Sequence, residues 1–223
     1  MEEINKKYSR RDGYYYKGSK RYVSVTTALQ CINKPALVSW AGYGCAKTAL
    51  EDPSLTHTEV YAKFMDGTKT KKAGMGTRIH EISEGIEKGT IKDVENISED
   101  LRGYVKAFQS FLKEIKPELL LSETKVYSEK YGYAGSLDRV WKIGDSIVLA
   151  DIKTSKNLYK EYGLQVEAYR RGCYEMGLVE KIDKTKGLLL KPNGTFDWKE
   201  MNGDFDVFLS CLKLWRWLYE EVE

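Results

Sequence analysis

Residues 133 to 153, YAGSLDRVWKIGDSIVLADIK, form the stretch that decides the fold. The run 135 to 143 alternates in character, the run 146 to 152 is rich in β-branched and aliphatic residues, and the pair Gly144-Asp145 lies between them. Glycine tolerates the positive φ that a tight hairpin loop needs, and such a pair between two strand-like runs is a strong hairpin signal. We therefore predict a β-hairpin that turns at Gly144-Asp145.

Two aspartates meet in this hairpin. A two-residue loop places Asp138 directly opposite Asp151, whereas a three- or five-residue loop would shift the pairing by one residue. Because strand side chains alternate in direction, Asp138, Asp151 and Lys153 share one face. Like charges that face each other on a sheet are destabilising, so the pair requires a shared proton or a cation. A hard divalent cation such as Mg²⁺, with Lys153 beside it, meets that requirement.

The two faces of the hairpin differ in polarity. Val140 and Leu149 share the face of the aspartates, which is therefore half apolar. The other face is mainly apolar and is predicted to be core, with Leu137, Trp141, Val148, Ala150 and Ile152.

The bulk composition is that of an ordinary globular protein. Hydrophobic residues make up 42% and charged residues 31% of the 223 residues, which excludes a disordered chain and is enough for one domain with a real core. The net charge of +3 is too small to indicate a nucleic-acid partner by itself. Any basic binding surface must therefore come from local clustering of lysine and arginine.

The four cysteines are scattered along the chain without a CxxC spacing, at Cys31, Cys45, Cys173 and Cys211. This pattern argues against a zinc ribbon, an iron–sulfur cluster or a disulfide framework. The N-terminus lacks the apolar core of a signal peptide, and no stretch of about 18 apolar residues offers a membrane span. We therefore expect a soluble protein of the cytoplasm, or of the host cytoplasm if the protein is viral, with no membrane partner.

Helices and strands are predicted along the rest of the chain. The expected elements are a hairpin over 13 to 27, a helical region over 26 to 50, a mobile basic loop over 63 to 76, helices over 77 to 89, 98 to 116, 158 to 176 and 204 to 221, and strands over 119 to 128 and 186 to 191. A three-stranded meander followed by helix, strand and helix predicts an α/β fold with a central mixed sheet, flanked by helices and preceded by a helical N-terminal extension.

Polar residues on several of these elements accompany the aspartate pair. An Asp-x-Lys on a strand is common by chance, and His80, beside an apolar helical stripe, would by itself favour a structural role. Here the pattern continues with Glu123 on the preceding strand and with Gln165 and Tyr169, which project together from the following helix. Five elements in this order are hard to explain by accident.

In this order the residues resemble the PD-(D/E)XK nuclease superfamily and, within it, the RecB-type exonuclease branch, which includes phage exonucleases and the mitochondrial genome maintenance exonuclease. The matching segments are SVTTAL at 24 to 29, KPAL at 34 to 37 with Trp40 after it, GTRIH ending at His80, GYAGSLD ending at Asp138, DIKTSK starting at Asp151 and QVEAY starting at Gln165. The resemblance implies a restriction-endonuclease-like core within a single domain, 1 to 223, in which 1 to 95 is mostly helical and 96 to 223 is the catalytic core.

The resemblance also implies roles for individual residues. Asp138, Asp151, the Ile152 carbonyl and His80 would hold Mg²⁺ or Mn²⁺, and Glu123 is similar to the first-motif acid of the family. Lys153 would polarise the attacking water, and a lowered pKa would let it act as a general base. Gln165 would hold the lysine or the substrate, supported by Tyr169. The cysteine quartet of the iron–sulfur members is missing, so no iron–sulfur cluster is expected.

These residues predict a metal-dependent deoxyribonuclease, an exonuclease acting on DNA ends or single strands in replication, recombination or repair, with protein partners from those processes. Residues 26 to 90 would arch over the site. Candidate DNA contacts are Trp40, Tyr43, Ser155, Lys156 and the basic loop with Lys69, Lys71 and Lys72. Two alternatives stay open at this stage: a structure-specific DNA endonuclease, and a DNA-binding module on the same fold without catalysis.

Overall fold

The computed structural model describes residues 9–11, 13–91, 94 and 97–220. Its described strands form one eight-stranded sheet in the order β1-β2-β3-β5-β6-β7-β8, with β4 paired to β5 outside this path. Pairing is parallel between β3 and β5 and between β6 and β7, and antiparallel elsewhere. The strands are β1 (Ser9–Arg11), β2 (Tyr14–Lys17), β3 (Lys20–Ser24), β4 (Glu118–Ser128), β5 (Tyr133–Ile143), β6 (Ser146–Lys153), β7 (Lys184–Leu190) and β8 (Phe196–Glu200).

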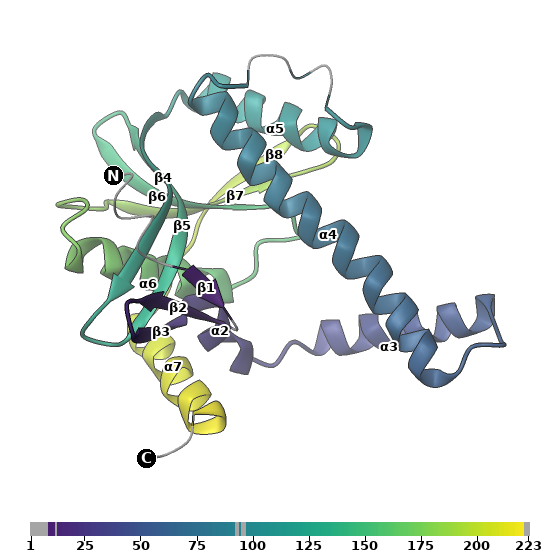
Figure 1. The fold of residues 1–223 in the computed structure, drawn as a ribbon. Coiled ribbons are helices and arrows are strands. Elements are labelled where there is room, and N and C mark those ends of the chain that lie inside the picture. The colour runs from purple at the N-terminus through teal and green to yellow at the C-terminus, as the bar shows by residue number, and fades with distance from the viewer. Residues whose placement is uncertain (1–8, 12, 92–93, 95–96, 221–223) are drawn as a thin grey trace.

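Helices cover the sheet, and the predicted α/β fold with a mixed sheet, flanking helices and a helical N-terminal extension is confirmed (Figure 1). The helices are α2 (Val25–Ala28), the 3₁₀ turn η1 (Leu29–Cys31), α3 (Pro35–Glu51), α4 (His57–Glu87), α5 (Glu99–Ile115), α6 (Glu161–Glu175) and α7 (Phe205–Tyr219).

Two hydrophobic cores lie on the two faces of the central hairpin. Trp141, Ala150 and Ile152 pack with residues of α4, α5 and β7, as the alternation predicts. Val140 and Leu149 pack with α6 and α7. Leu137, predicted on the Trp141 face, belongs instead to the α6–α7 core. The alternation of the hairpin does not extend to this residue, because the pairing of β5 with β6 ends at Arg139.

Helix α4 differs from the prediction. The basic segment 63 to 76, expected as a loop, and the helix expected from Thr77 are parts of one helix, His57–Glu87. A capping box starts it, because the Thr56 side chain accepts from the Glu59 N–H while Glu59 accepts from the Thr56 N–H. The glycines of this segment each lower helix propensity by about 1 kcal/mol relative to alanine, which favoured a loop on local grounds alone.

The outer strands extend the predicted sheet. The hairpin expected over 13 to 27 is present as β2 and β3, with Lys17 opposite Lys20 around the Gly18-Ser19 turn, and β1 adds a strand outside it. Strand β8 was not predicted. It pairs antiparallel with β7 after a turn at Pro192-Asn193-Gly194, which follows the strand predicted over 186 to 191.

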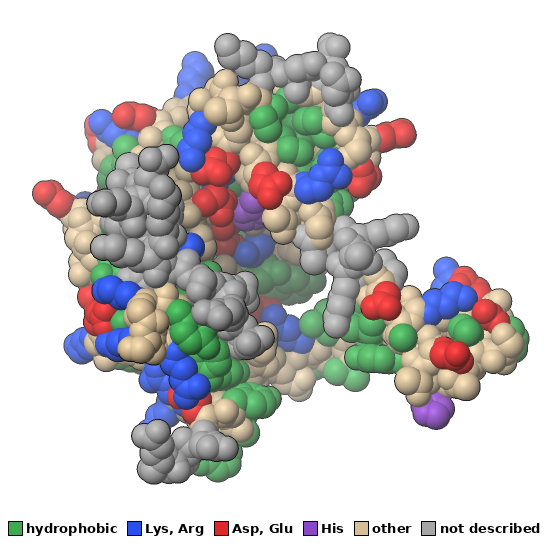
Figure 2. All heavy atoms as spheres, viewed as in Figure 1, with side chains coloured by type: hydrophobic (Ala, Val, Ile, Leu, Met, Phe, Trp, Pro, Cys, Tyr) green, Lys and Arg blue, Asp and Glu red, His purple; other side chains and the backbone are tan. Residues whose placement is uncertain are grey.

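Helix α3 and the first half of α4 form an arm that extends away from the sheet (Figure 1). No residue of α3 is buried, and the arm is held together where the Trp40 ring packs on the Phe64 ring, with centroids 4.8 Å apart. The space-filling view shows an opening between the arm and the body of the molecule (Figure 2). Although α4 is long, none of the described helices combines the length and the apolar character that a membrane crossing requires.

Candidate metal centre

The central hairpin has the predicted register. Antiparallel pairs run from Ile143 opposite Ser146 to Arg139 opposite Ala150, and Gly144 in the loop has a φ of 57°. The ladder thus ends one residue before the two aspartates. Beyond the ladder, the Ile152 N–H donates to the Asp138 carboxylate instead of to a strand carbonyl, with Ile152 N 2.6 Å from Asp138 Oδ2. The aspartates therefore lie where β5 and β6 separate rather than within a regular ladder.

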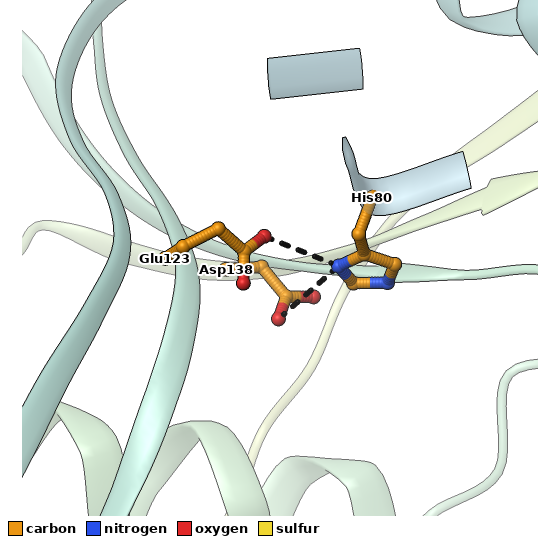
Figure 3. A group of neighbouring side chains, drawn as sticks. All are labelled: His80, Glu123 and Asp138. Carbon is orange, nitrogen blue, oxygen red and sulfur yellow. Dashed lines mark hydrogen bonds and ion pairs between the residues drawn. The ribbon is translucent and has the colours of Figure 1, made fainter. Parts of the chain in front are cut away.

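Three ligand-type side chains from three elements converge beside this point (Figure 3). His80 of α4, Glu123 of β4 and Asp138 of β5 place one ligand atom each within 4.8 Å of one another. The His80 Nδ1 lies 3.3 Å from Glu123 Oε1 and 3.7 Å from Asp138 Oδ1. We call these three residues the ligand group. Acidic side chains gather with a histidine in the hollow between the sheet and α4 (Figure 2).

Glu123 enters the ligand group through an unusual backbone conformation. Its φ is 43°, in the left-handed region that residues other than glycine rarely adopt. Such a conformation carries strain and persists only where the surrounding contacts hold it, which is common at functional sites. Strand periodicity alone therefore gave no reliable direction for this side chain.

The imidazole of His80 faces acceptors on both sides. Its Nε2 lies 3.1 Å from the Ile152 carbonyl oxygen, while Nδ1 faces the carboxylates of Glu123 and Asp138. Burial lowers the pKa of His80, but the negative charges of Asp138 and Glu123 outweigh burial and raise that pKa to about 9. Without a metal ion, the ring is therefore an imidazolium that donates from both nitrogens. The Ile152 carbonyl, predicted as a metal ligand, faces this ring.

Asp151 lies beside the ligand group and is only 1% exposed. Its Oδ2 is 2.5 Å from the Lys153 Nζ, and its Oδ1 accepts from the Gln165 Nε2 at 3.1 Å. Burial, followed by the charge of Asp151, raises the pKa of Asp138 above its usual range. The two predicted carboxylates thus interact strongly even though they are not a ladder pair.

The pKa of Lys153 is shifted in the direction opposite to the one that the general-base hypothesis requires. Burial lowers its pKa, but the charges of Asp151 and Asp138 outweigh burial, so the net shift of that pKa is upward. The ammonium also lies over the Tyr162 ring, 4.8 Å from its centroid. A general base needs a lowered pKa, so in this arrangement Lys153 is a hydrogen-bond donor.

In the structure Gln165 of α6 contacts Asp151, whereas the resemblance implied the lysine or the substrate as its partner. Gln165 donates to Asp151 and, at 3.1 Å, to the Tyr169 hydroxyl, so both predicted residues of α6 form one chain of hydrogen bonds. Gly135 makes room for this arrangement, because a Cβ at that position would lie 2.4 Å from Tyr169 Cε1. The glycine three residues before Asp138 is thus explained by the approach of Tyr169.

Two buried residues of the centre were missed in the sequence. The Arg139 guanidinium donates to Glu87 at 2.6 Å and to Glu123 at 2.8 Å, and Glu87 also accepts from the Trp141 indole at 2.6 Å. A signal was present for each. Arg139 is a charged residue on the predicted core face of a strand, and Glu87 follows His80 by about two helical turns.

The candidate DNA contacts lie in two places. Ser155 and Lys156 follow Lys153, and the Ser155 hydroxyl donates to the Asn157 carbonyl at 2.7 Å. Trp40 and Tyr43 lie on α3 of the arm, where Trp40 is 38% and Tyr43 80% exposed. The side chains of Lys69, Lys71 and Lys72 lie outside the described part of the structure.

The donor set fits a hard divalent cation. Carboxylate and carbonyl oxygens suit Mg²⁺ and Mn²⁺, and the single imidazole is better suited to Mn²⁺. The raised pKa values of His80 and Lys153 favour their charged forms, whose positive charge balances the buried acids, as a bound cation also would. His80, Glu123 and Asp138 could together hold such a cation.

Comparisons with known proteins add little to this geometry. No protein-family model and no curated protein matches the chain. Among solved structures, the crystal structure of a protein named SSO0001 matches 98% of this chain and 82% of its own, with 13% sequence identity and a TM-score of 0.43. At this level the likeness carries no information about activity.

Proposed function

We propose that the protein is a metal-dependent deoxyribonuclease that hydrolyses phosphodiester bonds, an exonuclease acting on DNA ends or single strands. The observation that supports this proposal is the convergence of His80, Glu123 and Asp138 next to the buried Asp151–Lys153 pair. The sequence resemblance to RecB-type exonucleases points to the same chemistry, since its motifs supply Asp138, Asp151 and Lys153.

The residues of the chain have separable tasks in this chemistry. When bound, a divalent cation stabilises charge at the scissile phosphate and helps to deprotonate the attacking water. His80, Glu123 and Asp138 would hold it. Lys153 keeps its proton and donates a hydrogen bond to the attacking water or to a phosphate oxygen. Asp151 orients Lys153 through its Oδ2, while its Oδ1 accepts from the Gln165 Nε2, so Gln165 supports this orientation.

The shape and surface of the arm favour single-stranded DNA as the proposed substrate. The opening between the arm and the body lies beside the hollow that holds the acidic side chains (Figure 2). Apolar side chains of the first half of α3 are exposed, with Leu37 at 55%, Val38 at 72% and Tyr43 at 80%. Unpaired bases stack on aromatic side chains with little regard to sequence, each stack contributing about 1–3 kcal/mol. Tyr43 and the partly exposed Trp40 offer such stacking faces, which suit a strand whose bases are unpaired.

The test is a time course on 5′- and 3′-labelled single- and double-stranded oligonucleotides with Mg²⁺ or Mn²⁺. We expect degradation that stops with EDTA, and a loss of about 100-fold or more in rate for Asp151→Ala and for Lys153→Ala, the scale of removing one preorganised electrostatic group. Lys181→Ala, which changes a lysine with a 76% exposed side chain, is the matched control and should keep the wild-type rate. Full activity in both active-site variants would exclude this mechanism.

The same assay separates the alternatives. Metal-independent DNA binding with no cleavage of any of these substrates would favour a binding module without catalysis. Cleavage within the oligonucleotides, away from their ends, would favour the structure-specific endonuclease.

A further inference from the structure

Arg139 is the most completely buried charged residue near the ligand group, with a side chain that is 0% exposed. Its guanidinium donates from Nε to Glu87 Oε2 at 2.6 Å, and from Nη1 to Glu123 Oε1 at 2.8 Å and to the Asp138 carbonyl at 2.7 Å. One planar group thus connects α4, β4 and β5, the three elements that supply the ligand group.

Glu87 supplies the counter-charge for this buried cation. Its side chain is 4% exposed, and its second oxygen accepts from the Trp141 Nε1 at 2.6 Å. Removing one partner of a buried ion pair leaves an uncompensated charge, so replacing either Arg139 or Glu87 alone is expected to destabilise the fold. The charge of Arg139 is therefore neutralised by Glu87, and its contact with Glu123 is additional.

The contact with Glu123 acts on a strained residue. Glu123 has a φ of 43°, and the oxygen that Arg139 holds is the one that lies 3.3 Å from the His80 Nδ1. A rigid fork of donors can hold two carboxylates in fixed positions at once, which a lysine ammonium on a flexible stem cannot do. Loss of the Arg139 contact would leave His80 as the described partner of that oxygen, and we expect the strained Glu123 backbone then to relax more readily.

We propose that Arg139, neutralised by Glu87, is a positioning residue that holds Glu123 in its left-handed conformation and so sets the metal affinity of the ligand group. The proposal rests on the metal site of the proposed function. Partners that orient a metal ligand from behind commonly account for a 10- to 100-fold difference in metal affinity.

The test measures Mn²⁺ binding to the full-length protein by the electron paramagnetic resonance signal of free Mn²⁺. Arg139→Met with Glu87→Gln removes both charges together and leaves no lone buried charge. We expect this pair of changes to weaken Mn²⁺ binding by about 10- to 100-fold. In a Glu123→Ala background the same pair should weaken binding less than about threefold, because the residue through which Arg139 acts is already gone.

A matched control and a second variant keep the test decisive. Glu167→Gln changes another buried acid, paired with Arg170 and Arg171 on α6, and should leave Mn²⁺ affinity within about threefold of wild type. Arg139→Lys keeps the buried charge against Glu87 but loses the fork, and should also weaken Mn²⁺ binding. If the double change prevents folding, as judged by circular dichroism, Arg139→Lys is carried through the same Glu123→Ala comparison.

The outcomes distinguish this proposal from the proposed function. A wild-type protein that does not bind Mn²⁺ removes the metal site and this proposal together. If the wild type binds Mn²⁺ and the folded variants bind equally well, only the role of Arg139 is overturned. An equal loss of affinity with and without Glu123 also overturns it, because a loss of that kind does not pass through Glu123.

Discussion

Charged side chains of both signs lie close together at the centre of this molecule. The imidazolium of His80 and the ammonium of Lys153 contact Glu123, Asp138 and Asp151, all within a region that is largely shielded from water. Charges in such surroundings interact more strongly than at the surface, and their protonation is therefore linked to the stability of the fold. The pKa of His80 is the quantity that reports most directly on these interactions between charged groups.

We predict that metal-free protein loses stability as pH rises from about 6.5 to about 9. His80 has a pKa raised from 6.5 to about 9, so its proton stabilises the folded state fully below the lower value, and that stabilisation disappears as pH passes the upper one. Urea unfolding of wild type and His80→Gln in EDTA measures the effect, and the difference between them should shrink across this window.

Magnetic resonance gives an independent measurement of the same proton. The chain has two histidines, so in a His57→Gln variant the remaining imidazole signals belong to His80. Their titration midpoint should lie near pH 9 in EDTA and fall when Mg²⁺ is added, because a metal ligand must be deprotonated. A midpoint at or below the ordinary 6.5 would contradict the arrangement of acceptors around the ring.

Gly135→Ala should destabilise the protein by about 1–3 kcal/mol, the usual effect of overpacking a core. The added Cβ would lie 2.4 Å from Tyr169 Cε1, so the ring must move, and Gln165 with it. Urea unfolding measures the loss. In a Tyr169→Leu background the added methyl group meets a smaller side chain, and the further loss should be less than half as large. If Gly135→Ala lowers the free energy of unfolding equally in both backgrounds, the contact with Tyr169 is not the cause of the destabilisation.

At the scale of single elements, α4 joins two parts of the molecule. Its 31 residues run from the capping box at Thr56, in the arm, to Glu87, which is buried against β5. The arm itself depends on a close approach of α3 and α4 at Gly44, where a Cβ would lie 2.0 Å from Phe64 Cε2. At Gly42, two residues earlier on α3, an added Cβ would have no atom within 4 Å.

These two glycines provide a matched pair of substitutions. Gly44→Ala should loosen the arm, so we predict faster hydrogen–deuterium exchange in peptides from 35 to 66, with Mn²⁺ affinity within about twofold of wild type. Gly42→Ala should leave exchange unchanged or slow it, because alanine favours a helix by about 1 kcal/mol over glycine. The same exchange in both variants would mean that the α3–α4 contact does not hold the arm.

At the scale of the whole molecule, the arm leaves an opening between itself and the body (Figure 2). The chain leaves the body after η1, runs out along α3 and returns along α4 (Figure 1). The ligand group lies on the returning helix and the adjacent strands. Under the proposed function, a single strand that enters through this opening would be threaded from an end.

We therefore predict that covalently closed single-stranded DNA circles survive conditions that degrade the same DNA once it is linearised. The difference in rate should be at least about tenfold if threading is required, because a closed circle offers no end to enter the opening. Gel analysis of circular and linear DNA in one reaction tests this directly. Cutting of circles at the rate of linear DNA would favour the endonuclease alternative.

Much of the fold follows from local patterns in the sequence. Period-two alternation and the Gly144-Asp145 turn predicted the register of the central hairpin, which is confirmed up to Arg139 opposite Ala150, while Asp138 and Asp151 lie just beyond this last pair. Spacing along α6 likewise placed Gln165 and Tyr169 on one side of that helix. These features depend on neighbours a few residues apart, for which backbone geometry is nearly sufficient.

Other features arise only when distant segments pack together. The left-handed backbone of Glu123, the contacts of Arg139 with Glu87 and Glu123, and the upward pKa shift of Lys153 depend on partners from separate elements. Local propensity also predicted a loop where α4 is continuous. Electrostatic and packing energies act through space rather than along the chain. Local patterns therefore predicted the hairpin register and the side chains of α6 that project together, whereas packing between distant elements set the charge of His80 and Lys153, the direction of Glu123 and the contacts of Arg139.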